Sequence, residues 1–257
     1  MKHHAAMADQ TLEWRVEEAC LNAWPALREV LLDNWLLRFS EGLSRRANSA
    51  NPLRQVAHTP RRECEVLYRR QELPTIYRML SLIDQSVDEE LAAAGYSREG
   101  DSSVLYGAID DIDTKPDSDV RLLAKPTPEW FGAMAALQNH TIEEAGTYQQ
   151  IVGRIAIPAA FAVLSADGKI VALAYGAIHN ALLCYESVVT DRRRRRRGYG
   201  RRIIASVAAW AKKNGAQGAC LQVESSNIPA CALYDGMGLK RELYRYHYRR
   251  EPRPQNG

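Results

Sequence analysis

The chain has 257 residues, of which 46% are apolar, 25% charged and 8% aromatic. This composition is typical of a globular protein with a buried core, and it excludes disordered, collagenous and fibrous classes. The formal net charge is +3, and the arginine run Arg192–Arg197 alone contributes +6, which leaves −3 for the rest of the chain. The basic excess is therefore local, and it indicates one anion-binding loop rather than a general affinity for nucleic acid.

No segment has the length or composition of a membrane span or a secretory signal. The longest weakly polar stretch, Ile155–Ala166, is shorter than the roughly 20 apolar residues that cross a membrane. The start, Met1–Ala6, lacks the apolar segment of a signal peptide. Neither a CxxC pair nor the ligand spacing of a zinc site is present, which predicts free thiols, no metal and a cytoplasmic protein. The five cysteines are Cys20, Cys64, Cys184, Cys220 and Cys231.

The first half of the chain predicts mixed α and β structure. Apolar residues at helical spacing run from Leu12 to Leu32, with an interruption at Pro25. The segments Trp35–Phe39 and Ser103–Gly107 have the composition of strands, and Ile83–Ala94 has that of a helix. An acidic segment without an apolar period follows, and we expect it to form a linker.

The second half predicts an α/β unit with a mixed central sheet. Its helices are marked by caps and apolar stripes, and its strands by short apolar runs between turn residues. The expected elements are a strand at Val120–Ala124, a helix capped by Thr127, a hairpin of Ala160–Leu164 and Ile170–Ala177 around Asp167 and Gly168, a strand at Leu182–Thr190, a helix at Arg201–Lys213, a strand at Gly218–Glu224, a short helix at Pro229–Gly236, and a closing strand or strand pair at Leu239–Arg249.

The loop after the strand Leu182–Thr190 carries six arginines and two glycines directly before an amphipathic helix. Gly198 and Gly200 permit positive φ angles and let an anion approach the backbone without meeting a Cβ atom. The start of the helix adds free N–H groups and the positive end of its dipole. We therefore predict that this loop binds an anion.

Two motifs in this half resemble those of the GNAT superfamily, the N-acetyltransferases that use acetyl-coenzyme A. Arg195-x-x-Gly198-x-Gly200 is similar to the pyrophosphate loop R/Q-x-x-G-x-G/A. From Asn227 to Leu239 the chain resembles N-x-x-A-x-x-L-Y-x-x-x-G-F, with Leu239 in place of phenylalanine. The motifs have the order, separation and secondary-structure setting of that superfamily. The chain is thus identified as a member of it.

The resemblance covers residues 120–249 and implies a GNAT fold with a catalytic site. In the first half, Trp35–Phe39 followed by Arg45–Leu53 resembles the leading half of bacterial tandem GNAT proteins. That half lacks the R-x-x-G-x-G loop, so we expect it to hold no coenzyme. An unrelated α/β domain is the alternative. The expected units are a degenerate GNAT-like or other α/β domain at 8–110, a linker at 111–119 and a catalytic GNAT domain at 120–250.

By resemblance, acetyl-coenzyme A lies between the strands that hold Glu186 and Glu224. The backbone at Val188 and Val189 would pair with the amides of the pantetheine arm, and Asn227 would bind the arm or a water molecule. The pyrophosphate would contact the arginine-glycine loop and the first turn of the helix. Its expected binding residues are Arg195, Arg196, Arg197, Gly198, Tyr199, Gly200 and Arg201.

The implied reaction is direct attack of a primary amine on the thioester, which requires a neutral amine and a proton for the departing thiolate. A lysine-like amine costs roughly 4–5 kcal/mol to deprotonate at pH 7, so such an acceptor needs a base. Glu186 or Glu224 is the candidate general base, acting through water, and Tyr234 is the candidate general acid. These residues and Asn227 also have a purely structural interpretation. The glutamates would pair with arginines on the sheet surface, Tyr234 would pack in the core, and Asn227 would cap a helix.

Two other functions remain open at this point. A coenzyme-binding regulator would keep the glycine loop without needing Tyr234. An arginine-rich nucleic-acid-binding protein would use Arg192–Arg197 against phosphates. For the enzyme we expect a small-molecule or peptide amine as acceptor, no membrane, and a monomer or homodimer. Cys220 and Cys231 are expected to be small buried residues, and the alternating Tyr244, Tyr246 and Tyr248 to pack in the core.

Overall fold

The computed structural model of the chain describes residues 11–252, so the interpretation of Met1–Ala6 lies outside the described residues. The strands are β1 (Arg28–Leu32), β2 (Trp35–Phe39), β3 (Ala50–Pro52), β4 (Ile76–Leu80), β5 (Ser97–Ala108), β6 (Val120–Leu123), β7 (Ala159–Ala166), β8 (Lys169–His179), β9 (Leu182–Thr190), β10 (Gly218–Glu224) and β11 (Arg241–Arg250). The α-helices are α1 (Leu12–Ala23), α2 (Arg61–Arg69), α3 (Gln85–Ala93), α4 (Pro128–Gln138), α5 (Ile142–Gly153), α6 (Tyr199–Lys213) and α7 (Ile228–Gly236).

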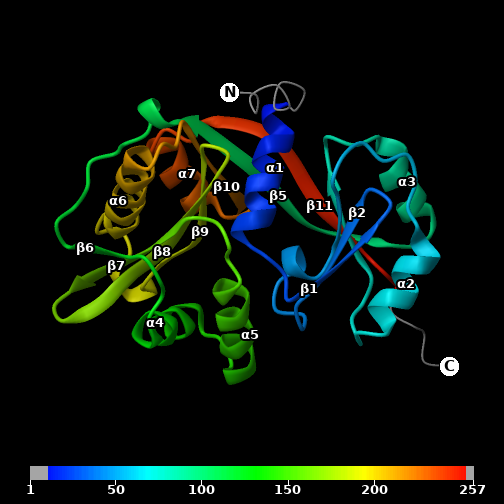
Figure 1. Cartoon of the computed structure of the whole chain (residues 1–257), viewed down its shortest axis with the longest axis horizontal. Coiled ribbons are helices and arrows are strands. Elements are labelled where there is room, and N and C mark those ends of the chain that lie inside the picture. Colours follow the sequence, from blue (N-terminus) through cyan, green and yellow to red (C-terminus); the bar gives the residue numbers. More distant parts are fainter. Residues whose placement is uncertain (1–10, 253–257) are drawn as a thin grey trace, which may run out of the picture.

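All these strands form one sheet in the order β1-β2-β3-β4-β11-β5-β10-β9-β8-β7-β6. Only the β3–β4 and β9–β10 pairs are parallel, so the predicted mixed sheet is confirmed and is mostly antiparallel. Helices α2 and α3 lie at one end of the molecule and α4 to α7 at the other, with α1 between them (Figure 1). In the part of the chain from residue 11 to 252, no helix is long and apolar enough to cross a membrane.

Alternate residues of β7 pack on opposite faces of the sheet, as the two-residue period of a strand requires. Leu164 joins a buried cluster with Ile203 of α6, whereas Val163 joins another with Trp130 of α4. The same alternation holds in the first half. There Tyr77 of β4 packs with Tyr68 of α2. The preceding residue, Ile76, lies on the other face and joins the core under α1. Each face of the sheet therefore has its own helical cover.

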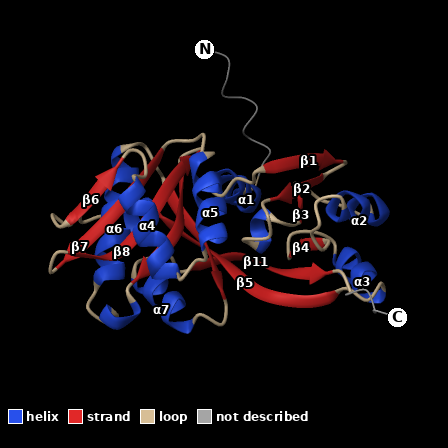
Figure 2. Ribbon diagram, turned by 90° about the horizontal axis from the view of Figure 1, so that it is seen from below, coloured by secondary structure: helices blue, strands red, loops and turns tan. Residues whose placement is uncertain are grey.

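Strand β11 is a single long strand, one of the two forms expected for its segment. It pairs antiparallel with β4 on one side and with β5 on the other. Figure 2 shows β5 and β11 running side by side toward α3. Tyr244, Tyr246 and Tyr248 are all buried on the face that α1 covers, which confirms their predicted packing in the core.

The helix expected from Leu12 to Leu32 is wrong beyond Ala23. Its first part is α1, but residues 28–32 form β1, which turns into β2 through Asp33 with a positive φ of 52°. Pro25 blocks helix continuation, and the two-residue turn between Leu32 and Trp35 closes a hairpin instead. The apolar spacing was misleading because β1 is mostly exposed at the edge of the sheet.

The second half follows the expected order, with one addition. The hairpin, the strands β9 and β10 and the helix α6 are where the sequence placed them, and Thr127 caps α4 by accepting a hydrogen bond from the Trp130 amide. The addition is α5, which follows α4 before the hairpin. Its start at Ile142 is marked by a capping box in which Thr141 and Glu144 satisfy each other's backbone amides.

Strand pairing crosses the boundary expected between the two halves. β5 lies in the segment 8–110, yet it pairs with β10 and β11 from the segment 120–250. In the segment 111–119, Ile112 is buried and Asp117 forms an ion pair with Arg202 of α6. The division into three units stays a prediction, and the two larger ones share a single sheet.

Candidate active site

β9 and β10 open a gap at the middle of the sheet. They pair in parallel only where Leu182–Cys184 faces Gly218–Cys220. Beyond this point the backbone of β9 has no strand partner on the β10 side among the described residues. Ser187 has a positive φ of 52°, and the register with β8 shifts beside it. This bulge bends β9 away from β10 and so widens the gap.

The arginine-glycine loop lies at the open end of this gap. Arg196 and Gly198 both have positive φ, and Gly198 is the N-cap of α6, which has no side-chain cap. A Cβ atom on Gly198 would meet nothing within 4 Å, whereas one on Gly200 would approach Leu233 to 3.0 Å. The first turn of α6 therefore presents backbone N–H groups to open space, as an anion site requires.

A cavity of about 300 Å³ joins this loop to the gap. Of the residues predicted to bind the coenzyme, Val189 and Arg197 do not line it. Those that do are Val188, Arg195, Arg196, Gly198, Tyr199, Gly200, Arg201, Asn227 and Tyr234. The two motifs, which are far apart in sequence, thus meet around one cavity.

Several arginines of the basic segment are paired with aspartates. Arg194 binds Asp167, and Arg201 binds Asp113. Arg202 binds both Asp117 and Asp119. These pairs leave Arg195 and Arg196 as the arginines that face the cavity without an ion pair among the described residues. Unpaired positive charge therefore lies beside the cavity, and the exposed Arg192, Arg193 and Arg197 of the same loop add to it, since they form no ion pair among the described residues.

Tyr234 projects from α7 and is 8% exposed. Its hydroxyl makes no hydrogen bond to any residue between 11 and 252, and its ring lines the cavity. Burial, followed by the negative charge of Glu186, raises the pKa of the Tyr234 phenol above its usual value. The phenol is therefore protonated near neutral pH and has a proton to donate. Asn227 lines the same cavity and also caps α7, where its side chain accepts from the Ala230 amide.

Glu186 is buried and bound by an arginine from the first half of the chain. Arg46 donates two hydrogen bonds of 2.7 Å, one to each oxygen of Glu186, and a third of 3.0 Å to Gln222 of β10. Its guanidinium also lies 5.4 Å from the ring of Trp24. Burial works against the charged form of Arg46, but the attraction of Glu186 outweighs it and raises the arginine pKa. Arg46 thus bridges β9 and β10 across the gap.

Glu224 is more accessible, with 56% of its side chain exposed. Arg45 donates a hydrogen bond of 2.7 Å to it, and the guanidinium lies 5.0 Å from the ring of Tyr248. Both glutamates considered as bases are therefore paired with neighbouring arginines of the first half. Arg45 and Arg46 lie in the segment that resembles tandem GNAT proteins, but nothing in their spacing predicts these contacts. Arg45 is 179 residues from Glu224 in the chain, and Arg46 is 140 residues from Glu186.

A second cavity, of about 380 Å³, lies on the side of these arginines. Residues of both halves line it, among them Arg45, Ser102, Gln222, Glu224 and Tyr246. Arg46, which binds Glu186, lines this cavity as well. One cavity thus lies beside the arginine-glycine loop, and the other lies beside the accessible carboxylate of Glu224.

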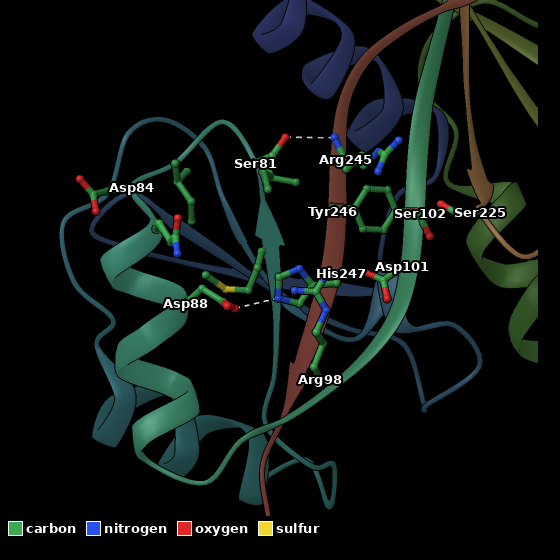
Figure 3. Close-up of a pocket in the computed structure, with 14 residues that line it drawn as sticks. Ser81, Asp84, Asp88, Arg98, Asp101, Ser102, Ser225, Arg245, Tyr246 and His247 are labelled. Atoms are coloured by element: carbon green, nitrogen blue, oxygen red, sulfur yellow. Dashed lines mark hydrogen bonds and ion pairs between the residues drawn. The ribbon is translucent and has the colours of Figure 1, made fainter.

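A cavity of about 500 Å³ lies elsewhere, between β4, β5, β11 and α3 (Figure 3). Most of its charged side chains form ion pairs: Asp88 with His247, Asp101 with Arg98, and Arg245 with a glutamate outside the cavity. Ser81 accepts a hydrogen bond from the Arg245 amide. Because these groups already have partners and lie apart from the glycine loop, the gap between β9 and β10 is the candidate active site.

Cys20, Cys184 and Cys220 come together in the core, although their spacing in sequence gave no indication of this. Their three sulfur atoms lie within 4.8 Å of one another. Cys220 is buried as predicted, whereas Cys231 is only partly buried. The Sγ atom of Cys231 lies 4.0 Å from the backbone oxygen of Glu224.

Comparison with known proteins connects this geometry to a family. A family model described as "Probable histone acetyltransferase Rv0428c C-terminal" matches residues 13–249. The chain belongs to this family. The match extends over both halves, so the family includes the first half as well as the segment 120–249 in which the two motifs lie.

Two curated relatives agree with this assignment. The chain is 24% identical over 240 residues to a Bacillus subtilis protein named "Uncharacterized N-acetyltransferase YobR", covering 91% of this chain and 97% of the relative. It is 35% identical over 118 residues to the "Probable histone acetyltransferase Rv0428c" of Mycobacterium tuberculosis, covering 45% of this chain and 36% of that protein.

Solved structures confirm the GNAT fold. A GCN5-related N-acetyltransferase from Kribbella flavida has a TM-score of 0.70 at 15% identity, over 95% of this chain and 97% of its own. A tandem GNAT protein from the clavulanic acid biosynthesis pathway has a TM-score of 0.60 at 13% identity, over 79% of this chain and 74% of its own. The chain is a GNAT-type N-acetyltransferase.

Proposed function

We propose that this protein transfers the acetyl group of acetyl-coenzyme A to a primary amine by direct attack on the thioester. The observation that carries the proposal is the opening between β9 and β10, which is continuous with an uncapped helix start and two unpaired arginines. A diphosphate at the helix start places the remainder of the coenzyme in the opening. The thioester then lies beside Tyr234.

In this proposal the pyrophosphate binds the backbone from Gly198 to Gly200 and the side chains of Arg195 and Arg196. The pantetheine amides pair with the free backbone edge at Val188 and Val189, as an added strand would. Arg197 is exposed and outside the cavity, where it can meet the 3′-phosphate of the coenzyme. Asn227 keeps its capping bond and contacts the pantetheine or a bound water.

The transfer requires one bond to form and one to break. The amine nitrogen attacks the thioester carbon, the C–N bond forms, and the C–S bond then breaks to release the coenzyme thiolate. Tyr234 donates its proton to that sulfur. The amine proton leaves through a water molecule to a carboxylate.

We assign that carboxylate to Glu224 rather than Glu186. Both oxygens of Glu186 already accept hydrogen bonds from Arg46, whereas Glu224 is accessible and has one bond, from Arg45. A cationic amine entering the second cavity meets Glu224 first. Glu186 then has a positioning role: together with Arg46 and Gln222 it holds the two strands at the separation that the coenzyme needs.

The acceptor is a small molecule or a peptide bearing a primary amine, and it enters through the second cavity. The relative from Mycobacterium tuberculosis is named a probable histone acetyltransferase, which makes lysine-containing basic peptides one class to include. A panel of polyamines, aminoglycosides, amino acids and peptides, assayed by release of free thiol, identifies the class. Turnover with at least one amine distinguishes an enzyme from a coenzyme-binding regulator.

Coenzyme binding is tested by calorimetry with Gly198→Trp and a matched control, Gly215→Trp. Both glycines have positive φ and open space beyond the Cα atom, and they lie at opposite ends of α6. We expect micromolar affinity for acetyl-coenzyme A in the wild type and in Gly215→Trp, and loss of binding in Gly198→Trp. Equal affinity in all three proteins would refute the proposed site.

A further inference from the structure

We propose that Cys20, Cys184 and Cys220 form a binding site for a soft, thiophilic metal ion of low coordination number, of which Cu(I) is the representative. The site lies in the core, outside the two cavities of the active site. It is inferred from the arrangement of the sulfur atoms and is independent of the proposed acetyl transfer.

The geometry suits three-coordinate binding. All three side chains are buried, and the sulfurs lie within 4.8 Å of one another, with 3.6 Å between Cys184 and Cys20. A metal–sulfur bond of about 2.3 Å places the sulfurs of a planar trigonal site about 4.0 Å apart. The ion therefore fits among the three sulfurs if the distances between them change by up to about 0.8 Å, which side-chain torsions can absorb.

The chemistry of the donors selects the class of ion. Thiolates are soft ligands that favour Cu(I) and Zn(II), but Zn(II) in structural sites takes four ligands. Oε1 of Glu186 lies 3.9 Å from the Cys184 sulfur, but it already accepts a hydrogen bond from Arg46. Three sulfur ligands therefore favour an ion that binds three donors.

Binding of the ion replaces the thiol protons of the three cysteines, which pass to solvent, and no electron is transferred. The thiolates that form are the ligands of the ion.

The three cysteines come from α1, β9 and β10, three segments that are distant in sequence. Cys184 and Cys220 face each other in the last register pair before β9 and β10 diverge, and α1 covers them (Figure 1). An ion held here ties the apex of the active-site opening to the helix above it. Entry requires local opening of α1, so we expect binding over minutes rather than milliseconds.

The test is an anaerobic titration of the reduced protein with Cu(I) against a chromophoric chelator, and with Zn(II) in a parallel arm. We expect one Cu(I) per chain, about 100-fold weaker binding in each of Cys20→Ser, Cys184→Ser and Cys220→Ser, and weaker Zn(II) binding. The matched control is Cys64→Ser, because Cys64 is equally buried but belongs to a different cluster under α2. It should bind as the wild type does.

X-ray absorption on the copper-loaded wild type makes the result independent of how the variants fold. Three sulfur neighbours at about 2.3 Å support the site. Two sulfurs, or nitrogen and oxygen neighbours, overturn it. So does an affinity that falls as much in Cys64→Ser as in the three cluster variants, and so does tighter binding of Zn(II) than of Cu(I).

Discussion

Arg46 and Glu186 share two hydrogen bonds of 2.7 Å, although 140 residues separate them in the chain. The pair lies where β9 and β10 part, and its third bond, to Gln222, reaches the opposite strand. The segment that was expected to hold no coenzyme therefore contributes a side chain to the centre of the opening. The family match likewise extends into the first half.

Removing either partner of this pair should destabilise the protein, and the two losses should not add. Arg46→Ala leaves the Glu186 charge buried and unpaired, and Glu186→Ala does the same to Arg46, so each should lower the free energy of unfolding by about 3 kcal/mol. The double variant should lose clearly less than the sum of the two. Chemical denaturation of the four proteins measures this coupling. Additive losses would show that the contact contributes nothing to stability.

Tyr234→Phe should separate binding from chemistry. The ring remains in its buried position, so affinity for acetyl-coenzyme A should stay within about two-fold of the wild type. Turnover should fall by about 10²-fold or more, the range of a general acid. Calorimetry and the thiol-release assay measure the two quantities on the same preparation. An unchanged turnover number would remove Tyr234 from the mechanism.

Glu224→Gln should slow transfer in a manner that depends on pH. At pH 7 a lysine-like amine is mostly protonated, so loss of the acceptor carboxylate should lower turnover by about 10²-fold. Near pH 9 more of the amine is neutral, and the defect should shrink. Glu99→Gln is the control, because Glu99 shares Arg45 with Glu224 but lies outside both cavities of the active site. A defect of the same size at both pH values would contradict the assignment.

Asp88 should contribute to stability except in acid. Two hydrogen bonds from Arg249, together with one from His247, lower the pKa of Asp88 to about 2. An unfolded aspartate titrates near 3.9. The pair therefore stabilises the fold fully above that value, and the contribution is lost as pH falls toward 2. The unfolding free energies of wild type and Asp88→Asn should differ at pH 5 and converge by about pH 2.

The control for this measurement is Asp235→Asn, because Asp235 is exposed and forms no ion pair among the described residues. Its variant should follow the wild type throughout the same range. If the difference between wild type and Asp88→Asn is as large at pH 2 as at pH 5, the contribution of Asp88 is not electrostatic.

Local features of the second half could be predicted because each depends on a few adjacent residues. Thr127 before Pro128, the glycines 198 and 200 before an amphipathic helix, and the Asp167–Gly168 turn each have a short-range physical cause. The meeting of Tyr234 with the glycine loop was predictable only through the family resemblance, since nothing in the spacing alone places them around one cavity.

Contacts between distant segments could not be predicted in this way. Periodicity shows which face of an element is apolar, but not which arginine of the first half reaches Glu186 or Glu224. The convergence of Cys20, Cys184 and Cys220 has the same origin, because it depends on how α1 lies over β9 and β10. Residues 28–32 were wrongly expected to be helical because β1 is an exposed edge strand, and such a strand does not need an alternating apolar pattern.

The position of β11 affects the order in which the protein can assemble during synthesis. This strand follows every other strand in the described chain, yet it fits between β4 and β5, which precede it by well over a hundred residues. Until residues 241–250 leave the ribosome, both earlier strands keep an unpaired edge. Such edges invite pairing with other chains, so a nascent chain of this protein should need protection by a chaperone until β11 has been synthesised.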